Sequence, residues 1–371
     1  MQNIFSIGVL RALAALAVMS GHAQEDLVRR LGLAQALPDM KLGYAGVDVF
    51  FVISGFIMVH ASDRLFGTAD GPLNFLRRRL IRIVPLYWSV TTLYLAIALG
   101  APHLPHKAYS PSMVAASYLF FPLLTSDGLQ EPVVGQGWTL NCEMLFYMLF
   151  CIAVTRPRYQ AVLLVSSVLA IAVMAGNIFA LPMPLAYWSQ EIVLEFVFGM
   201  ALGLIYMSGV RLRRWSRMLL IGTGLLLLGR TAWEIGAEDP HRSVVWGIPA
   251  ALIVAGAVLG ASSGPWTGVR WMGVIGDASY ALYLIHPLVG RAIREVFIRS
   301  GADLVAVSWL YFAAVAAATI AAALAVHFWF ERPITRALRD RFEGRERLMV
   351  PAAERTGSAP ASSQGTKPLA R

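Results

Sequence analysis

The chain has 371 residues, of which 57% are hydrophobic and only 14% charged, and its formal net charge is +9. This composition, with a mean hydropathy of +0.61, excludes a soluble globular protein with a polar surface. Basic residues outnumber acidic ones by 31 to 22, but no nucleic-acid-binding fold or aromatic-interleaved basic surface accompanies them. We therefore expect no nucleic-acid partner, and we attribute the charge excess to orientation in a membrane.

Apolar segments recur along the whole chain, each close to the length that crosses a bilayer. We expect ten spans, near residues 4–23, 46–62, 83–100, 138–155, 161–180, 188–208, 217–233, 244–261, 272–290 and 304–330. A shorter apolar stretch, residues 112–124, indicates an interfacial or re-entrant helix. The sequence therefore predicts an all-α, polytopic membrane protein with about ten transmembrane helices and one short additional helix.

The distribution of Lys and Arg favours a topology with both termini in the cytoplasm. Residues 1–3 lack basic character and Arg11 interrupts the first apolar stretch, so we expect a retained span and no cleaved signal peptide. We divide the chain into a transmembrane domain, residues 1–335, and a basic cytoplasmic tail, residues 336–371. The tail is expected to contact membrane lipid, and its composition predicts disorder from about residue 351.

The first predicted span carries an arginine and a histidine, Arg11 and His22. On an α-helix their spacing is about three turns, so both side chains lie on one face, roughly 16 Å apart along the axis. Ionisable groups inside a membrane are costly and usually mark a ligand or ion path. The alternative is an arginine that snorkels to one interface and a histidine that lies at the other.

Polar residues inside the predicted spans concentrate in the first 145 residues. Asp48 and Gly55 share one face of the second span, where a small residue permits close helix packing and a carboxylate can orient an imidazole. Alternatively, Asp48 caps the start of that span. Arg79 and Arg82 lie at i, i+3 on one helix face and suit a phosphate clamp. The alternative for this pair is an ordinary anchor at the inner membrane surface.

The fourth predicted span has a polar stripe, because Thr139, Glu143 and Tyr147 recur at i, i+4 and i+8. A buried carboxylate needs a partner. We expect Glu143 either to pair structurally with Arg11 or to take part in acid–base chemistry with His22.

Two later polar features are weaker. His286 directly precedes Pro287, and we interpret it as a satisfied structural histidine at a kinked position. The segment Glu331-Arg332-Pro333 is interpreted as a stop signal that ends the last span. No cluster of side chains has metal-ligand spacing, so we expect no metal site.

These motifs together resemble the acyltransferase type 3 family of integral membrane proteins. The resemblance runs in order from about residue 5 to 335 through six elements: Arg11 with ten residues before His22, Gly46-Val47-Asp48 to Ser54-Gly55-Phe56, Arg78-Arg79-x-x-Arg82-Ile83-x-Pro85, Trp138-Thr139-Leu140-x-x-Glu143, Ser279-Tyr280 to His286-Pro287, and Glu331-x-Pro333. It implies a bacterial inner-membrane enzyme that moves an acyl group, commonly acetyl, from cytosolic acyl-CoA to a sugar hydroxyl at the outer face. The chain looks like stand-alone members that modify exopolysaccharide or lipopolysaccharide.

The resemblance implies two groups of site residues: a catalytic group, His22, Asp48 and Glu143, and a donor-binding group, Arg11, Arg79 and Arg82. His22 is expected to act as a general base or to accept the acyl group itself, and the sequence does not separate these roles. Asp48 or Glu143 is expected to orient the imidazole. We expect acyl-CoA, most simply acetyl-CoA, as a donor substrate and no permanently bound cofactor. The expected acceptor is a carbohydrate or lipid-linked glycan, with polysaccharide-synthesis machinery as a further candidate partner.

Two other function classes remain open at this point. A secondary transporter or lipid-linked glycan flippase also carries charges in its spans, but such proteins often consist of two related halves with interrupted helices in matching positions. A non-catalytic membrane subunit of a polysaccharide synthase predicts instead that His22 is dispensable.

Overall fold

The computed structural model describes residues 5–32, 37–100, 108–125, 128–234, 241–260, 270–301, 303 and 305–349, and all structural statements concern these residues. Helices dominate the described chain. Its strands are limited to one antiparallel pair, β1 (Leu123–Thr125) and β2 (Gly128–Gln130). The predicted all-α class is confirmed.

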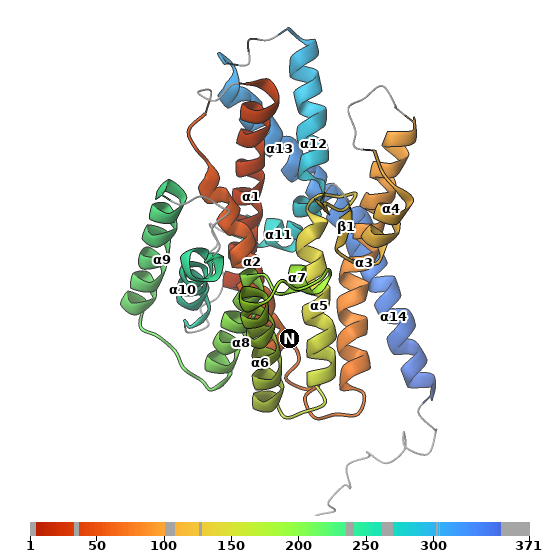
Figure 1. Ribbon diagram of the computed structural model, residues 1–371, viewed down its shortest axis with the longest axis vertical. Coiled ribbons are helices and arrows are strands. Elements are labelled where there is room, and N and C mark those ends of the chain that lie inside the picture. Colours follow the sequence, from red (N-terminus) through yellow and green to blue (C-terminus); the bar gives the residue numbers. More distant parts are fainter. Residues whose placement is uncertain are drawn as a thin grey trace, which may run out of the picture.

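The helices pack together as an irregular bundle (Figure 1). In chain order they are α1 (Phe5–Leu31), η1 (Lys41–Tyr44), α2 (Ala45–Ala61), α3 (Gly71–Gly100), α4 (Pro111–Tyr118), α5 (Gly137–Ala153), α6 (Arg158–Ile178), α7 (Leu185–Trp188), η2 (Glu191–Val193), α8 (Leu194–Met207), α9 (Arg214–Glu234), η3 (Ser243–Gly247), α10 (Ile248–Val258), α11 (Arg270–Asp277), α12 (Ser279–Arg299), α13 (Ser308–Val326), η5 (His327–Glu331) and α14 (Arg332–Met349). In Figure 1, α9 and α10 lie on one side and α3 and α4 on the other, while α14 projects at the lower right. The short α4 agrees with the helix expected near residues 112–124.

Five described helical stretches are long and apolar enough to cross a membrane, and the prediction of about ten spans is not confirmed. The five are Phe5–Val28, Lys41–Ala61, Gly71–Gly100, Arg158–Ile178 and Ser308–Phe342. A sixth arises if α11 and α12, which are bent by 72° relative to each other, count as one span. The chain therefore has several membrane-spanning helices, and the remaining apolar segments require a separate explanation.

The predicted span near residues 217–233 folds as the uninterrupted helix α9, which has 21 residues but is not among the helices apolar enough to cross a membrane. The remaining predicted spans fold as shorter or interrupted helices. Gly137–Ala153 and Ser243–Val258 are apolar but have fewer than 18 residues. The stretch near residues 188–208 is divided among α7, η2 and α8. An apolar sequence pattern predicts that a segment is hydrophobic. It does not predict where a helix ends or is interrupted, because that depends on local backbone geometry and packing.

Close contact between α2 and α8 fixes the centre of the bundle. A Cβ atom on Gly55 would lie 2.2 Å from the carbonyl oxygen of Phe196, and one on Gly199 would lie 2.0 Å from that of Val52. Both positions therefore require glycine, and the predicted close packing at Gly55 is confirmed. Beside this contact the ring of Phe196 stacks on Phe146 of α5, with centroids 4.2 Å apart.

Helix α12 continues through Pro287, so the kink expected there stays a prediction, and a sharp bend lies between α11 and α12, at Ala278. One expected helix end differs from the structure. The last predicted span does not end at Glu331, because α13 continues through the π-helix η5 directly into α14. The disorder predicted from residue 351 falls outside the described residues.

Candidate functional site

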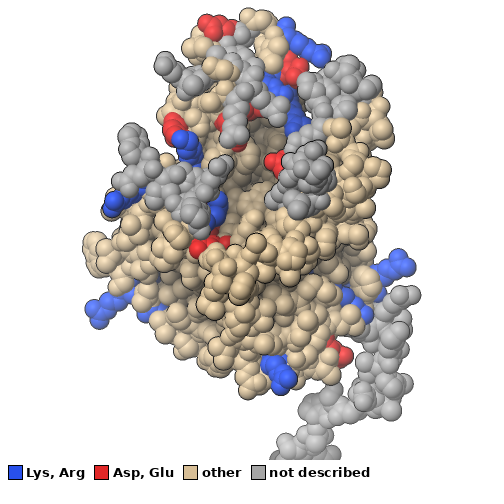
Figure 2. Space-filling model, viewed as in Figure 1, with Lys and Arg blue, Asp and Glu red and all other residues tan. Residues whose placement is uncertain are grey.

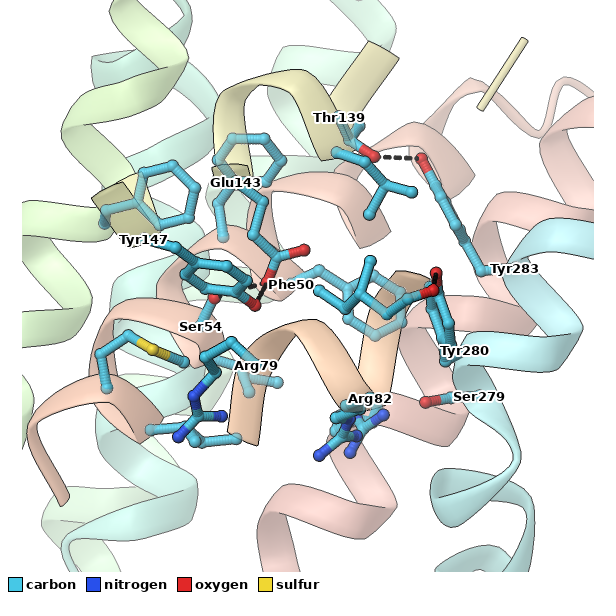
Figure 3. A pocket seen from close by; sticks show the side chains of 18 of the residues that line it. Phe50, Ser54, Arg79, Arg82, Thr139, Glu143, Tyr147, Ser279, Tyr280 and Tyr283 are labelled. Atoms are coloured by element: carbon cyan, nitrogen blue, oxygen red, sulfur yellow. Dashed lines mark hydrogen bonds between the residues drawn. The ribbon is translucent and has the colours of Figure 1, made fainter. Parts of the chain in front are cut away.

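A cavity lies inside the bundle, with side chains from α1, α2, α3, α5, α8 and α12 in its wall (Figure 3). It comprises about 820 Å³ of space free of protein atoms, including space open to the surroundings. Helix α2 supplies much of the wall through its apolar residues, which include Val47, Phe50, Phe51, Ile53, Ile57 and Met58. The cavity therefore combines an apolar wall with the polar groups described next.

Three guanidinium groups face this cavity, those of Arg11 on α1 and of Arg79 and Arg82 on α3. Within the described chain, none of the three has a carboxylate oxygen within 4.0 Å. The Nε atom of Arg79 is buried without a hydrogen-bond partner, and its guanidinium lies 5.6 Å from the ring centroid of Phe75. Since charge in a low-dielectric environment needs compensation, the cavity is suited to an anionic ligand.

The Glu143 carboxylate also faces the cavity, but it has a different partner from the one expected. The hydroxyl of Ser54 donates to its Oε1 atom over 2.9 Å, and the hydroxyl of Tyr147, one helical turn away, donates to the same atom. Figure 3 shows both hydroxyl groups directed at the carboxylate. The expected direct pairing of Glu143 with Arg11 or His22 is therefore wrong, whereas the predicted polar stripe on α5 is confirmed.

Tyr283 of α12 forms another part of the cavity wall. Its hydroxyl lies 3.1 Å from that of Thr139, a bond also drawn in Figure 3. The ring of Tyr283 lies 5.9 Å from that of Phe50 and 6.2 Å from that of His286, measured between centroids. Tyr283 thus has the cavity on one side and a histidine on the other.

His22 does not line the cavity and instead forms a pair with His286. Their ring centroids are 5.1 Å apart, and the ring of Tyr44 contacts His22 edge-on at 5.5 Å. The Nδ1 atom of His22 lies 2.9 Å from the carbonyl oxygen of Val18. Because a carbonyl can only accept, Nδ1 carries the proton and the Nε2 atom of neutral His22 keeps its lone pair.

The environment of His286 differs from the satisfied one that was expected. This side chain is only 2% exposed, and its Nδ1 atom lies 3.2 Å from the carbonyl oxygen of Leu282. Its Nε2 atom is buried and has no hydrogen-bond partner in the described chain. The interpretation of His286 as a fully satisfied structural histidine is therefore wrong at this nitrogen.

Asp48 is completely buried and pairs with Arg242 rather than with His22. The guanidinium donates from Nε to Oδ1 over 2.9 Å and from Nη2 to Oδ2 over 2.8 Å. Arg242 precedes the π-helix η3 and is 194 residues away from Asp48 in sequence. The expectation that Asp48 orients the His22 imidazole is therefore wrong, because a bidentate pair with arginine occupies both carboxylate oxygens.

Sequence reasoning missed Arg242 and the buried carboxyl group of Glu195. Glu195 on α8 is completely buried and interacts electrostatically with Asp48 and Arg242. The signal was present, since an acidic residue inside the predicted span at 188–208 calls for a cation elsewhere in the chain. Buried polar groups are consequently not confined to the first 145 residues. Glu331 is a further buried acidic residue, and its Oε2 atom lies 2.8 Å from the Nδ1 atom of His327.

Comparison with known proteins matches the chain to a family model and to individual relatives. A family model described as an acyltransferase domain matches residues 4–328. The exopolysaccharide production protein ExoZ of Rhizobium meliloti (strain 1021) is 36% identical over 304 residues, which cover 81% of this chain and 92% of that protein. The acyltransferase MdmB of Streptomyces mycarofaciens is 30% identical over 321 residues, covering 77% and 79% of the two chains. No solved structure gives a significant match.

Proposed function

The chain belongs to this acyltransferase family, and on that premise we propose that it transfers an acyl group from acyl-CoA to a hydroxyl group of an exported polysaccharide. The name of its relative ExoZ, which refers to exopolysaccharide production, supports a carbohydrate acceptor. We propose acetyl as the acyl group. A lipid-linked precursor and a finished polymer present the same hydroxyl chemistry to the enzyme.

The observation that carries this proposal is the set of three guanidinium groups without carboxylate partners around one cavity. Guanidinium groups bind phosphate oxygens in bidentate geometry, and CoA is a polyanion that would compensate their charge. The apolar wall from α2 suits the acyl group and the arm that carries it. Arg11, Arg79 and Arg82 would therefore hold the anionic part of the donor.

We place the arginine side of the cavity toward the cytoplasm, with both termini on that side of a bacterial inner membrane. The positive-inside rule supports this orientation. On the face shown in Figure 2, basic side chains lie around the lower half and also at the upper end, and a hollow opens in the upper half. Helix α1 lies in the upper and middle part of the bundle (Figure 1). Arg11 and His22 are about three turns apart on it, so a donor bound at Arg11 and an acceptor near His22 would approach from opposite sides.

In the proposed reaction, Nε2 of His22 takes the proton from the acceptor hydroxyl. The hydroxyl oxygen attacks the thioester carbonyl carbon, a carbon–oxygen bond forms, and the carbon–sulfur bond breaks. The CoA thiolate then takes the proton from His22 and leaves as a thiol. The free Nε2 lone pair of His22 supports this role. Glu143 is proposed to assist from the donor side, and Asp48 to position α2 through Arg242.

The test is replacement of His22 by alanine in a strain that lacks the native gene. Mass spectrometry of the surface polysaccharide should show that wild-type protein restores acylation and that His22→Ala does not, with a rate loss of about 100-fold or more. His60→Ala is a matched control, because His60 is another histidine in a membrane-spanning helix with an unpartnered buried nitrogen. Retained acylation with His22→Ala, at equal protein levels in the membrane, would contradict the proposal.

A further inference from the structure

We propose that the start of α12 is a second part of the donor site, where the Ser279 hydroxyl and the backbone N–H groups of the first helical turn bind the diphosphate of acyl-CoA together with Arg82. The inference rests on the proposed use of acyl-CoA as the donor. It adds to the three arginines a binding element without a formal charge, because the N-terminus of a helix attracts anions through its free N–H groups and its dipole.

The first argument is an unused hydroxyl group in the cavity wall. Ser279 lines the cavity and is completely buried, and its Oγ atom has no hydrogen-bond partner in the described chain. Figure 3 shows this hydroxyl on the side of the cavity where Arg82 lies. A buried polar group without a partner is unfavourable and calls for an explanation. A ligand that enters the cavity supplies the partner.

The second argument is the break between α11 and α12. The two helices are bent by 72° relative to each other, so a new helix begins at Ser279 inside the bundle. The first N–H groups of a helix have no intrahelical acceptor, and no side chain caps this helix, since Ala278 stands at its N-cap. Asp277, the last residue of α11, is exposed and makes no hydrogen bond to this turn in the described chain. In membrane proteins, the N-termini of such interrupted helices point at anionic substrate groups.

The third argument is the position of this turn beside the arginines. The hydroxyl of Tyr280 donates to the carbonyl oxygen of Ile83 over 2.8 Å, and Ile83 directly follows Arg82 on α3. Ser279, Tyr280 and Arg82 all line the same cavity. The hydrogen bond from Tyr280 therefore holds the first turn of α12 against the part of α3 that carries Arg82.

The charge of the cavity wall matches a diphosphate. Its charged lining residues are Arg11, Arg79, Arg82 and Glu143, so the wall has a formal charge of +2. The diphosphate of CoA is esterified at both ends and carries two negative charges at neutral pH. A diphosphate would therefore compensate the charge of this wall completely.

The distance to the histidines argues against the thioester carbonyl as the ligand of this turn. His286 follows Ser279 by seven residues on α12, a rise of roughly 10 Å. The ring of His286 contacts that of His22, with centroids 5.1 Å apart. The start of α12 is thus far from the proposed base, as is Arg11, which lies roughly 16 Å from His22 along α1. A donor whose diphosphate binds at this turn extends its pantetheine arm toward His22.

Two replacements of Ser279 test the assignment in membrane vesicles that contain the full-length protein and its native acceptor. Ser279→Ala removes the hydroxyl without adding bulk, and we expect it to raise the KM for acetyl-CoA about 10-fold while kcat stays nearly constant. Ser279→Asp places a carboxylate where the diphosphate binds and should raise this KM about 100-fold. Its unfolding temperature should stay constant or rise, because an acidic residue is favourable at a helix N-terminus.

Truncated donors separate binding from structure. S-Acetylpantetheine has no phosphate, so Ser279→Ala and the wild type should show equal kcat/KM with it. Acetyl-dephospho-CoA keeps the diphosphate and lacks only the phosphate on the ribose, so the effect of Ser279→Ala should be the same as with acetyl-CoA. Ser62→Ala is the matched control, because the Ser62 hydroxyl is also buried and unpartnered in the described chain but does not line the cavity. It should keep the wild-type KM.

Three results would overturn the inference. The first is an unchanged KM for acetyl-CoA in Ser279→Ala, and the second is an equal loss of kcat/KM with acetyl-CoA and with S-acetylpantetheine, as a purely structural serine would give. The third is loss of the effect with acetyl-dephospho-CoA. If Ser279→Ala fails to accumulate, Ser279→Asp supplies the same comparison of donors. Failure of the wild-type protein to use acetyl-CoA would instead contradict the proposed function, so the two failures are distinguishable.

Discussion

Among the arginines that the structure describes inside the bundle, two sets differ sharply in how their charge is compensated. In the first, Arg242 is bound by both oxygens of the completely buried Asp48. In the second, Arg11, Arg79 and Arg82 surround a cavity, and the described chain offers none of them a carboxylate within 4.0 Å. The one carboxylate that faces the cavity, Glu143, is occupied by hydroxyl groups.

Under the proposed function, this difference distinguishes charges that stabilise the fold from charges that bind the donor. A pair such as Asp48 and Arg242 joins segments 194 residues apart and is complete without any substrate. Unpaired guanidinium groups weaken the empty protein, so their retention around a cavity indicates compensation from outside the chain. This contrast can be tested at each site.

The largest effect is expected from breaking the complete pair. Asp48→Asn removes the carboxylate that binds the Arg242 guanidinium with both oxygens and should destabilise the protein by about 3–5 kcal/mol. Thermal unfolding in detergent and the protein level in membranes measure this loss. Adding Arg242→Gln should restore part of the stability, because the guanidinium charge that lost its bidentate partner is then removed as well. A stable Asp48→Asn variant that has lost only its activity would contradict this and favour a catalytic Asp48.

A smaller effect is expected at the cavity, and on a different quantity. Arg79→Gln and Arg82→Gln each remove a charged contact to the donor and should raise the KM for acetyl-CoA about 10- to 100-fold. The unfolding temperature should stay constant or rise, since no partner is left unpaired. Arg78→Gln, at an exposed neighbouring position, is the matched control. Unfolding of the Arg79 or Arg82 variant would show that these arginines are structural.

The smallest effect concerns the hydroxyl groups that occupy Glu143. Ser54→Ala removes one of the two donors to this carboxylate and should let it approach an arginine of the cavity. We expect the KM for acetyl-CoA to rise about threefold, with little change in kcat, as kinetics in vesicles can measure. Ser89→Ala, whose hydroxyl bonds only its own helix at Pro85, is the control. An unchanged KM would show that the hydrogen bond from Ser54 does not prevent the Glu143 carboxylate from pairing with an arginine of the cavity.

Much of the cavity could be predicted from helical spacing alone. The i, i+3 spacing of Arg79 and Arg82 and the i, i+4, i+8 stripe through Glu143 each place side chains on one face, and the structure brings these faces to one cavity. Close packing at Gly55 followed from the absence of a side chain. Local periodicity is sufficient for such statements because the helix geometry is fixed.

Pairings between distant helices could not be predicted in this way. Asp48 meets Arg242, and His22 meets His286, because of how the helices pack, which no local pattern encodes. The span count failed for a related reason: the bend at Ala278 and the breaks around α7 and η2 interrupt segments that are uniformly apolar in sequence.

Helix α1 runs without interruption from Phe5 to Leu31, and its regular geometry therefore fixes the distance between residues along it. The separation of roughly 16 Å between Arg11 and His22 is set by eleven rises of one helix and cannot adapt to the substrate. A donor can serve both residues only if its anionic group and its reactive carbon are that far apart. Acetyl phosphate, in which the two are directly bonded, is too short to span this distance, so donor choice here is a matter of length as well as charge.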